Sequence, residues 1–480
     1  MKKLASLLLL AAVLLSGCHR DEKDEPTPIN NNNNPSQNRN NNQKDYTVHR
    51  FIWETSYIYY YWNNNIPSRL DLTQFDTPYD VFENFRNEDD HFSSVLDNYS
   101  EVSQVFANEY TTDGINYALY LDKYNTNNVV ALVQYVYDNS PAAEAGVKRG
   151  QIIKAINGTT LTKDNYSTLL NQKGYTLTYT NIYTSDGTLQ YDGEEFTTPY
   201  ITKKKMDINS VLQVSTQEID GHNIGYFLYD SFDEDTVCIA NAISQLAASN
   251  VTDLVLDLRL NTGGYETTLV SLVSSLVPAG NEGKVFITKS MNKNLVAAYK
   301  KEGVDVSTKF THPSNRLNID KLYVLTSNET ASASEELISG LRPYMAVTLI
   351  GDTTYGKYTS NFLLNDEDDQ GTDNDGINYS EWALYLVVAC CTNSKGEMDF
   401  KDGFAPDYYL KDNYAKPLGD PEEPLFAKAI SLITNGGNPV IAKRAVKTPQ
   451  LGLDYIGSFG KPKILNTMMT NKPQTPISPR

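Results

Sequence analysis

The sequence is poor in the residues on which disulfide and metal chemistry depend. Its 480 residues include only 4 cysteines and 5 histidines. Besides Cys18, the cysteines are Cys238 and the adjacent pair Cys390 and Cys391, an odd number that gives neither a disulfide framework nor a Cys-x-x-Cys metal site. The histidines are scattered, without a His-Glu-x-x-His motif or any pair at ligand spacing. We therefore expect neither a metal nor another cofactor.

Positive charge and long apolar runs are also scarce. The net charge of −18 argues against nucleic-acid binding, which needs a basic surface. The N-terminal apolar run, Leu4 to Leu15, is shorter than the roughly 20 residues of a membrane-spanning helix. Because Lys2 and Lys3 precede this run and small residues follow it, the pattern is typical of a secretory signal.

The run "LLSGC", which ends at Cys18, resembles a bacterial lipoprotein box. The resemblance implies cleavage before Cys18 and attachment of lipid to its thiol and amine; the alternative is an ordinary signal with a chance cysteine. The following "HRDEKDE" resembles a surface-export tag of some Gram-negative groups, although a solvated tether explains it almost as well. We expect an outer-membrane lipoprotein that faces the periplasm or the cell surface.

The texture of the sequence changes several times along the chain. A low-complexity segment rich in Asn and containing Pro predicts a disordered tether. Apolar and aromatic residues at helical spacing then predict a small helical domain. Apolar residues that alternate with polar ones predict a β-rich domain after it. Strands that alternate with helices then predict an α/β layer, and a basic tail without an evident role follows. The expected boundaries are a signal at 1–18, a tether at 19–45, a helical domain at 46–107, a β-rich domain at 108–206, an α/β core at 207–437 and a tail at 438–480.

The stretch "SNETASASEELISG", from Ser327 to Gly340, places a serine-rich turn where a strand leads into a helix. Ser332 and Glu335 have the spacing of a capping box, which would be a structural role only. The same turn suits a nucleophile, because a serine there has backbone N–H groups close to its oxygen. Ser334 and Ser327 are rival nucleophiles, and Ser334 lies deeper in the expected helix.

Two further strand ends carry candidate chemistry. The segment "DLRLNTGGYE" ends a buried strand with Gly263 and Gly264, whose backbone N–H groups can approach a ligand closely. The segment "LIGDTTYGKYTSN" places Lys357 in a turn next to a glycine. A lysine accepts a proton only when neutral, so work near neutral pH requires its pKa to fall by roughly 3 units from about 10.4, which burial can supply. No histidine lies in these segments, so a Ser–His–Asp triad has no evident base.

Four motifs, "DLRLNTGG", "NETASASE", "GDTTYGK" and "GFAPD", occur in the order seen in the C-terminal processing, or tail-specific, proteases. Ser332 and Lys357 are 25 residues apart, which is similar to the spacing of that family's serine–lysine pair. The likeness extends over residues 46–435. It implies an α/β protease core with a ClpP- or crotonase-like layer, a PDZ-like β-rich domain and a small helical N-terminal domain.

The resemblance also assigns roles to residues. It makes Ser332 the nucleophile and Lys357 the general base of a peptidase that acts on protein or peptide substrates. The oxyanion hole would consist of the N–H of Ala333 and that of Gly263 or Gly264. The family usually has glutamine four residues after the lysine, to orient it; here that residue is Asn361, which is one methylene shorter.

The run from Asn139 to Leu161 resembles the second half of a PDZ domain, with Gln151 where that family usually has aspartate. The resemblance makes Gly114, Ile115 and Asn116 the loop that binds a terminal carboxylate, and the adjoining strand edge could accept a peptide by β-augmentation. The alternative is that the PDZ-like geometry serves only as a spacer.

Two rival functions stay open at this point. One is a binding protein on a protease scaffold, in which Asn361 and Gln151 mark lost catalysis; the other is a glycan-binding surface lipoprotein, suggested by the anchor and the 33 tyrosines. An acidic loop, "NDEDDQGTDNDGINYSE", fails the EF-hand template because Ile377 stands where glutamate is needed. We interpret it as a solvated insertion.

Overall fold

The computed structural model describes residues 46–106, 109–186, 188–319, 321–365, 378–398, 400–435, 451–460 and 468–469. Cys18, the expected signal and tether, and residues 366–377 of the acidic loop lie outside the described residues. Within the described part, no helix is long and apolar enough to cross a membrane, and no group of three or more His, Cys, Asp or Glu side chains is arranged to hold a metal.

The core is built on a six-stranded sheet in the order β14-β15-β16-β20-β21-β24. Its strands are parallel except for β14. Crossover connections therefore return the chain to the same end of the sheet before each parallel strand begins. The bounds are β14 Val211–Ile219, β15 His222–Tyr229, β16 Asp253–Asp257, β20 Lys321–Thr326, β21 Ala346–Gly351 and β24 Tyr408–Tyr409. This alternation confirms the predicted α/β core.

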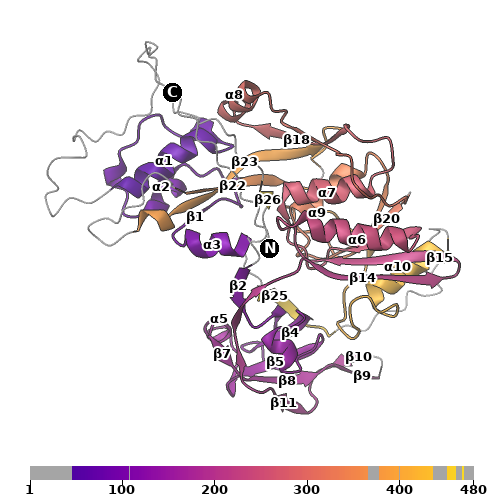
Figure 1. The fold of residues 1–480 in the computed structure, drawn as a ribbon. Helices are drawn as coiled ribbons and strands as arrows, with labels where there is room; N and C mark the ends of the chain where they lie inside the picture. Colours follow the sequence, from indigo (N-terminus) through magenta and orange to yellow (C-terminus); the bar gives the residue numbers. More distant parts are fainter. Residues whose placement is uncertain are drawn as a thin grey trace, which may run out of the picture.

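Helices separate this sheet from a second one, as Figure 1 shows. One hydrophobic cluster joins the first sheet, the helices α6 (Thr236–Ala248), α7 (Glu266–Leu276) and α9 (Ala333–Leu341), and residues of the second sheet. Helix α10 (Pro424–Thr434) covers the opposite face of the first sheet. The second sheet has the order β17-β26-β22-β23-β18-β19. Its bounds are β17 Gly264–Tyr265, β18 Val285–Met291, β19 Ser307–Lys309, β22 Thr359–Asn365, β23 Ala383–Asn393 and β26 Met468–Met469.

The N-terminal segment packs against the outer side of this second sheet. Helices α1 (Thr47–Tyr59) and α2 (Pro78–Phe85) share a hydrophobic cluster with β23 and with α8 (Lys293–Glu302). The segment also contains a short strand, β1 (Ser94–Leu96), which pairs with β23, before α3 (Tyr99–Phe106). The expected small helical region is therefore present, and it adds a strand to the core sheet.

The β-rich module is a separate sheet in the order β11-β8-β5-β4-β3-β25. It is joined to the core by the antiparallel pair β2 (Glu109–Thr112) and β13 (Lys204–Asp207). The bounds in the sheet are β3 Ile115–Leu121, β4 Val129–Val136, β5 Gln151–Ile156, β8 Leu177–Asn181, β11 Glu195–Thr197 and β25 Asp454–Phe459. Helices α4 (Pro141–Glu144) and α5 (Tyr166–Leu170) complete it. The edge strand β25 comes from the tail for which the sequence predicted no role.

Candidate active site

Ser332 lies immediately before α9, at the carboxyl end of β20. Its side chain is 1% exposed and its φ is 60°, an uncommon conformation for a residue other than glycine. The Ser332 hydroxyl makes no capping hydrogen bond and has no partner among the described residues. By contrast, Ser334 Oγ donates to Asn261 O (3.2 Å) and Ser327 Oγ donates to Arg259 O (2.6 Å). Of the three serines, Ser332 is the one whose hydroxyl remains available.

Lys357 lies between β21 and β22, and its long side chain is 1% exposed. Its Nζ donates to Tyr385 Oη (3.3 Å) and lies 5.7 Å from the centre of the Phe92 ring. Burial lowers the pKa of Lys357 to about 7, although the nearby Glu336 carboxyl acts in the opposite direction. A buried amine with this pKa is substantially neutral at neutral pH, which is the state that accepts a proton.

The carboxylate of Glu335 joins the serine turn to the lysine turn. One of its oxygens accepts from the backbone N–H of Ser332 (2.9 Å) and from that of Lys357 (2.8 Å). The other accepts from Thr354 Oγ1 (2.6 Å) and Gly356 N (2.7 Å). Since one oxygen binds both backbones, Ser332 and Lys357 are adjacent in space. Sequence reasoning recognised Glu335 only as part of a helix cap.

Gly263 fits closely against the serine turn. A Cβ at Gly263 would lie 2.8 Å from Ser332 Cβ and 3.2 Å from Ala333 N, so a side chain there is excluded. The N–H of Gly263 donates to Asn261 Oδ1 (2.9 Å) and is therefore engaged. The N–H of Ala333 is in the first turn of α9 and has no acceptor within the helix. Of the predicted oxyanion groups, Ala333 keeps an N–H without an acceptor in its helix, whereas Gly264 pairs with Met468 of β26.

Asn361 does not have the contact expected from its position in the sequence. Its Nδ2 donates to Phe92 O (3.1 Å), and no hydrogen bond joins it to Lys357 among the described residues. Its Oδ1 is buried and has no partner in this part of the chain. The partner of the lysine is instead Tyr385. Asn361 thus positions the N-terminal segment that carries Phe92 against the site.

Three residues of the site were not predicted from the sequence. Phe92 and Tyr385 flank the lysine from segments that lie far from it in the sequence, so only the fold brings them together. Glu336 follows Glu335 in α9, and burial raises the pKa of its carboxyl to about 8. Nothing in the sequence placed Phe92 beside Lys357.

The predicted carboxylate-binding loop at Gly114, Ile115 and Asn116 has two backbone N–H groups that donate to its own neighbouring side chains. The N–H of Gly114 donates to Thr112 Oγ1 (2.9 Å), and that of Ile115 donates to Asp113 Oδ1 (3.0 Å). Asn116 is buried within β3. The N–H groups of Gly114 and Ile115 are therefore already hydrogen-bonded to neighbouring side chains. The buried Asp113 carboxylate would also repel a second anion there.

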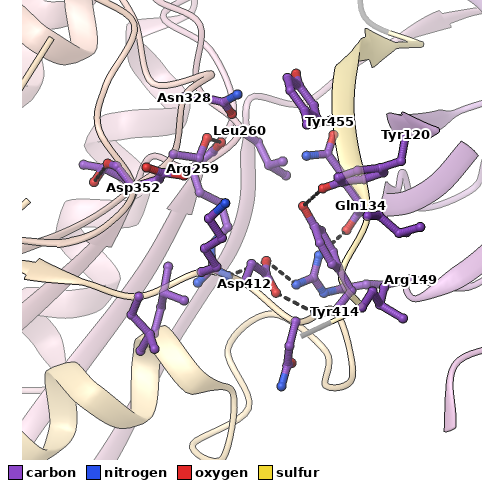
Figure 2. Close-up of a pocket in the computed structure, with 18 of the residues that line it drawn as sticks. Tyr120, Gln134, Arg149, Arg259, Leu260, Asn328, Asp352, Asp412, Tyr414 and Tyr455 are labelled. Atoms are coloured by element: carbon purple, nitrogen blue, oxygen red, sulfur yellow. Dashed lines mark hydrogen bonds and ion pairs between the residues drawn. The ribbon is translucent and has the colours of Figure 1, made fainter. Parts of the chain in front are cut away.

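The PDZ-like module is bound to the core next to the serine turn. Asp412 accepts from Arg149 of the module (2.5 Å) and from Arg259 of the core (2.8 Å), and Arg259 also pairs with Glu423. Burial alone would raise the pKa of Asp412, but the two guanidinium groups hold it at about 2. Figure 2 shows Arg149, Arg259 and Asp412 at a cavity of about 430 Å³ between the module and the core, and Tyr455 of the tail also lines it.

The comparisons with known families cover all three parts of the chain. Residues 47–94 match the Peptidase S41 N-terminal domain, 132–179 a PDZ domain and 223–410 Peptidase family S41, which includes the serine and lysine turns. The chain belongs to peptidase family S41. This confirms the predicted family and the predicted combination of domains.

Relatives of this S41 chain carry names that describe carboxy-terminal processing. It is 26% identical over 228 residues to the carboxy-terminal processing protease CtpB of Bacillus subtilis, covering 46% of this chain and 43% of that protein. It is 27% identical over 305 residues to a carboxyl-terminal-processing protease of Synechocystis, covering 62% and 63%. The matches thus span about half of these relatives. A crystal structure of a putative S41 protease from Bacteroides fragilis superposes with a TM-score of 0.68 at 25% identity, covering 80% of this chain and 97% of that one.

Proposed function

We propose that this protein is a serine endopeptidase with a Ser332–Lys357 dyad. One observation carries the proposal. Glu335 binds the backbone N–H of two buried residues: Ser332, whose hydroxyl has no hydrogen-bond partner among the described residues, and Lys357, whose pKa is about 7. The names of the relatives support a substrate that is a protein or peptide, cleaved in its C-terminal region.

The proposed reaction follows from these groups. Neutral Lys357 takes the proton of Ser332 Oγ as that oxygen attacks the scissile carbonyl. The N–H of Ala333, together with that of Gly264, stabilises the negative charge on the carbonyl oxygen. The lysine ammonium then gives its proton to the leaving amine, and water, activated by the same lysine, hydrolyses the acyl-enzyme. Each proton that the lysine accepts is thus returned within one cycle.

Two further parts of the proposal concern placement. We propose that the edge of the PDZ-like sheet, rather than the loop at 114–116, binds an extended substrate segment. We also propose that Cys18 is lipidated and anchors the protein to the outer membrane, on the strength of the sequence pattern alone. Membrane fractionation of cells that carry the parent or Cys18→Ala tests the anchor, since the variant should leave the membrane fraction.

Digestion of casein and of a tailed peptide tests the dyad. The parent should cleave both, and Ser332→Ala and Lys357→Met should each lower kcat/KM by about 10⁴-fold or more, as in other nucleophile–base pairs. Ser334→Ala is the matched control and should retain activity. If both dyad variants cleave like the parent, the assignment is wrong. If the folded parent cleaves nothing, the rival, a peptide- or glycan-binding protein on a protease scaffold, is favoured.

A further inference from the structure

The tail of the chain lies along the edge of the PDZ-like sheet. Strand β25 pairs with β3 in antiparallel register, from Phe459 opposite Tyr117 to Asp454 opposite Leu121. The other edge of β3 pairs with β4, so β25 occupies the position that an added peptide strand would take. Figure 1 shows β25 beside the strands of the module, where it is the outermost strand, next to β3.

Side chains as well as backbone fix β25 in place. Phe459 packs against the hydrophobic core of the module. Tyr455 lies edge-to-face on Tyr120, with ring centres 5.6 Å apart, and its hydroxyl donates to Glu329 Oε1 of the core (3.3 Å). After β25, the backbone passes so close to the 114–116 loop that a Cβ at Gly460 would lie 2.0 Å from Ile115 O. The tail therefore follows the surface on which a peptide ligand of the module would lie.

A second strand of the same tail lies in the active site. In β26, Met468 pairs with Gly264 and Met469 with Tyr265, in β17. On its other side, Met469 pairs with Asn361 in β22. Strand β17 begins at the glycine pair beside Ser332, and β22 begins two residues after Lys357. The two strands that flank β26 are thus the continuations of the two catalytic turns; Figure 1 shows β26 beside β22.

We propose that the described parts of the C-terminal segment, residues 451–460 and 468–469, occupy the peptidase's own substrate path in cis and compete with substrate. The proposal rests on the function proposed above. A polypeptide substrate would use the same two stretches, the edge of β3 and the gap between β17 and β22. Because both are strand pairings, the main chain of an extended polypeptide supplies most of the recognition.

The same geometry explains why the tail competes with substrate without closing the substrate path permanently. Strand β25 is an edge strand of six residues, and β26 has only two. Short edge strands open locally at a small cost in free energy. A substrate segment with a more favourable side chain at the Phe459 position displaces β25 by mass action. The tail therefore raises the substrate concentration that is needed to occupy the path.

Two full-length variants test the proposal in opposite directions. Ser458→Pro combined with Phe459→Asp removes a strand N–H and the apolar anchor, and should raise kcat/KM for casein several-fold. Ala118→Cys combined with Ser458→Cys, which are paired residues, should lower it when oxidised and recover on addition of reductant. If the release variant and the oxidised variant both match the parent, the proposal is overturned. The locked pair remains informative even if the release variant fails to fold.

Binding separates this proposal from the function on which it rests. A fluorescent peptide with the sequence of residues 451–470 should bind the release variant that also carries Ser332→Ala, and unlabelled casein should displace it; a scrambled peptide should not bind. If the peptide binds and is displaced but no variant cleaves, the peptidase assignment fails and the shared path stands. If the parent cleaves casein, but the peptide neither binds nor inhibits the release variant, the shared path fails and the peptidase assignment stands.

Discussion

Two glycine-containing loops in this protein look alike in sequence and behave differently in the structure. Gly263 and Gly114 both have positive φ and both lie next to a sheet. At Gly263 the residue's own N–H donates to Asn261 Oδ1, but the neighbouring Ser332 hydroxyl has no partner among the described residues and the first N–H of α9 has no acceptor in its helix. At Gly114 the side chains of Thr112 and Asp113 occupy the backbone donors.

The comparison teaches that a glycine turn is not by itself an anion site. Glycine permits a close approach of the backbone, but the neighbouring side chains decide whether the N–H groups remain available. In the core, the carboxylate of Glu335 binds N–H groups of the two turns and leaves the Ser332 hydroxyl free. In the module, the Asp113 carboxylate occupies the position where a ligand carboxylate was expected.

Adding one methyl group at each glycine tests the comparison most severely. Gly263→Ala should lower kcat/KM by about 10²–10³-fold, similar to the loss of one oxyanion donor, because its Cβ would displace Ser332. Gly114→Ala collides with Ser140 Cβ at 2.1 Å and should destabilise the module without changing kcat on a short ester substrate. Steady-state kinetics and thermal unfolding of both variants give the two readouts. Equal losses of kcat would contradict the difference between the loops.

Glu335→Gln should have the next largest effect. Glu335 accepts four hydrogen bonds, whereas a glutamine amide offers one oxygen and adds donors that face the existing N–H groups. We expect the free energy of unfolding to fall by about 1–3 kcal/mol. We also expect kcat/KM to fall by more than this loss of stability explains, because the Ser332 turn and the Lys357 turn would move apart. Chemical denaturation and kinetics on the same sample check this, and an unchanged kcat/KM would disprove the tie between the turns.

A pH profile sharpens the assignment of the base. Because Lys357 works when neutral and burial lowers its pKa to about 7, kcat/KM should rise as the pH rises through about 7. The ionised Glu336 carboxylate favours the charged lysine, but its pKa of about 8 keeps it mostly protonated near pH 7, so Glu336→Gln should shift this rise only slightly, to lower pH.

Glu218→Gln, an exposed site on β14, is the matched control for the pH experiment and should leave the profile in place. A shift of the profile to higher pH in Glu336→Gln would contradict the role assigned to the lysine.

The sequence predicted the parts of this molecule that depend on local pattern. Buried strands alternating with helices gave the core sheet, and the turns around Ser332, Lys357 and Gly263 lie together because each follows a strand of that core. The positions of Phe92 and Tyr385 beside the lysine were not predictable, since they depend on how the N-terminal segment packs on β23. The pairing of the tail with β3 was missed because β25 has no partner nearby in sequence.

The mildest test concerns Asp113, whose carboxylate lies beside the predicted carboxylate-binding loop at Gly114. Asp113 accepts from Ile115 N (3.0 Å) and Tyr117 Oη (3.0 Å), and also from Tyr175 Oη, so its carboxylate is structural. Asp113→Asn should lower the free energy of unfolding by about 1–3 kcal/mol, because donors that the carboxylate satisfied lose an acceptor. It should leave kcat/KM within a factor of two of the parent value.

Tyr175→Phe removes one of the donors to Asp113 and serves as the matched variant, with a smaller loss of stability and no loss of activity. Thermal unfolding and casein digestion on one preparation give both quantities. A gain in affinity for peptides with a free C-terminal carboxylate in Asp113→Asn, absent in the amidated peptide, would show that the loop is a carboxylate site kept closed by its own aspartate. Because Gly114 N would still be bound to Thr112 Oγ1, we expect no such gain, and substrate entry would then depend on displacing β25 rather than on opening this loop.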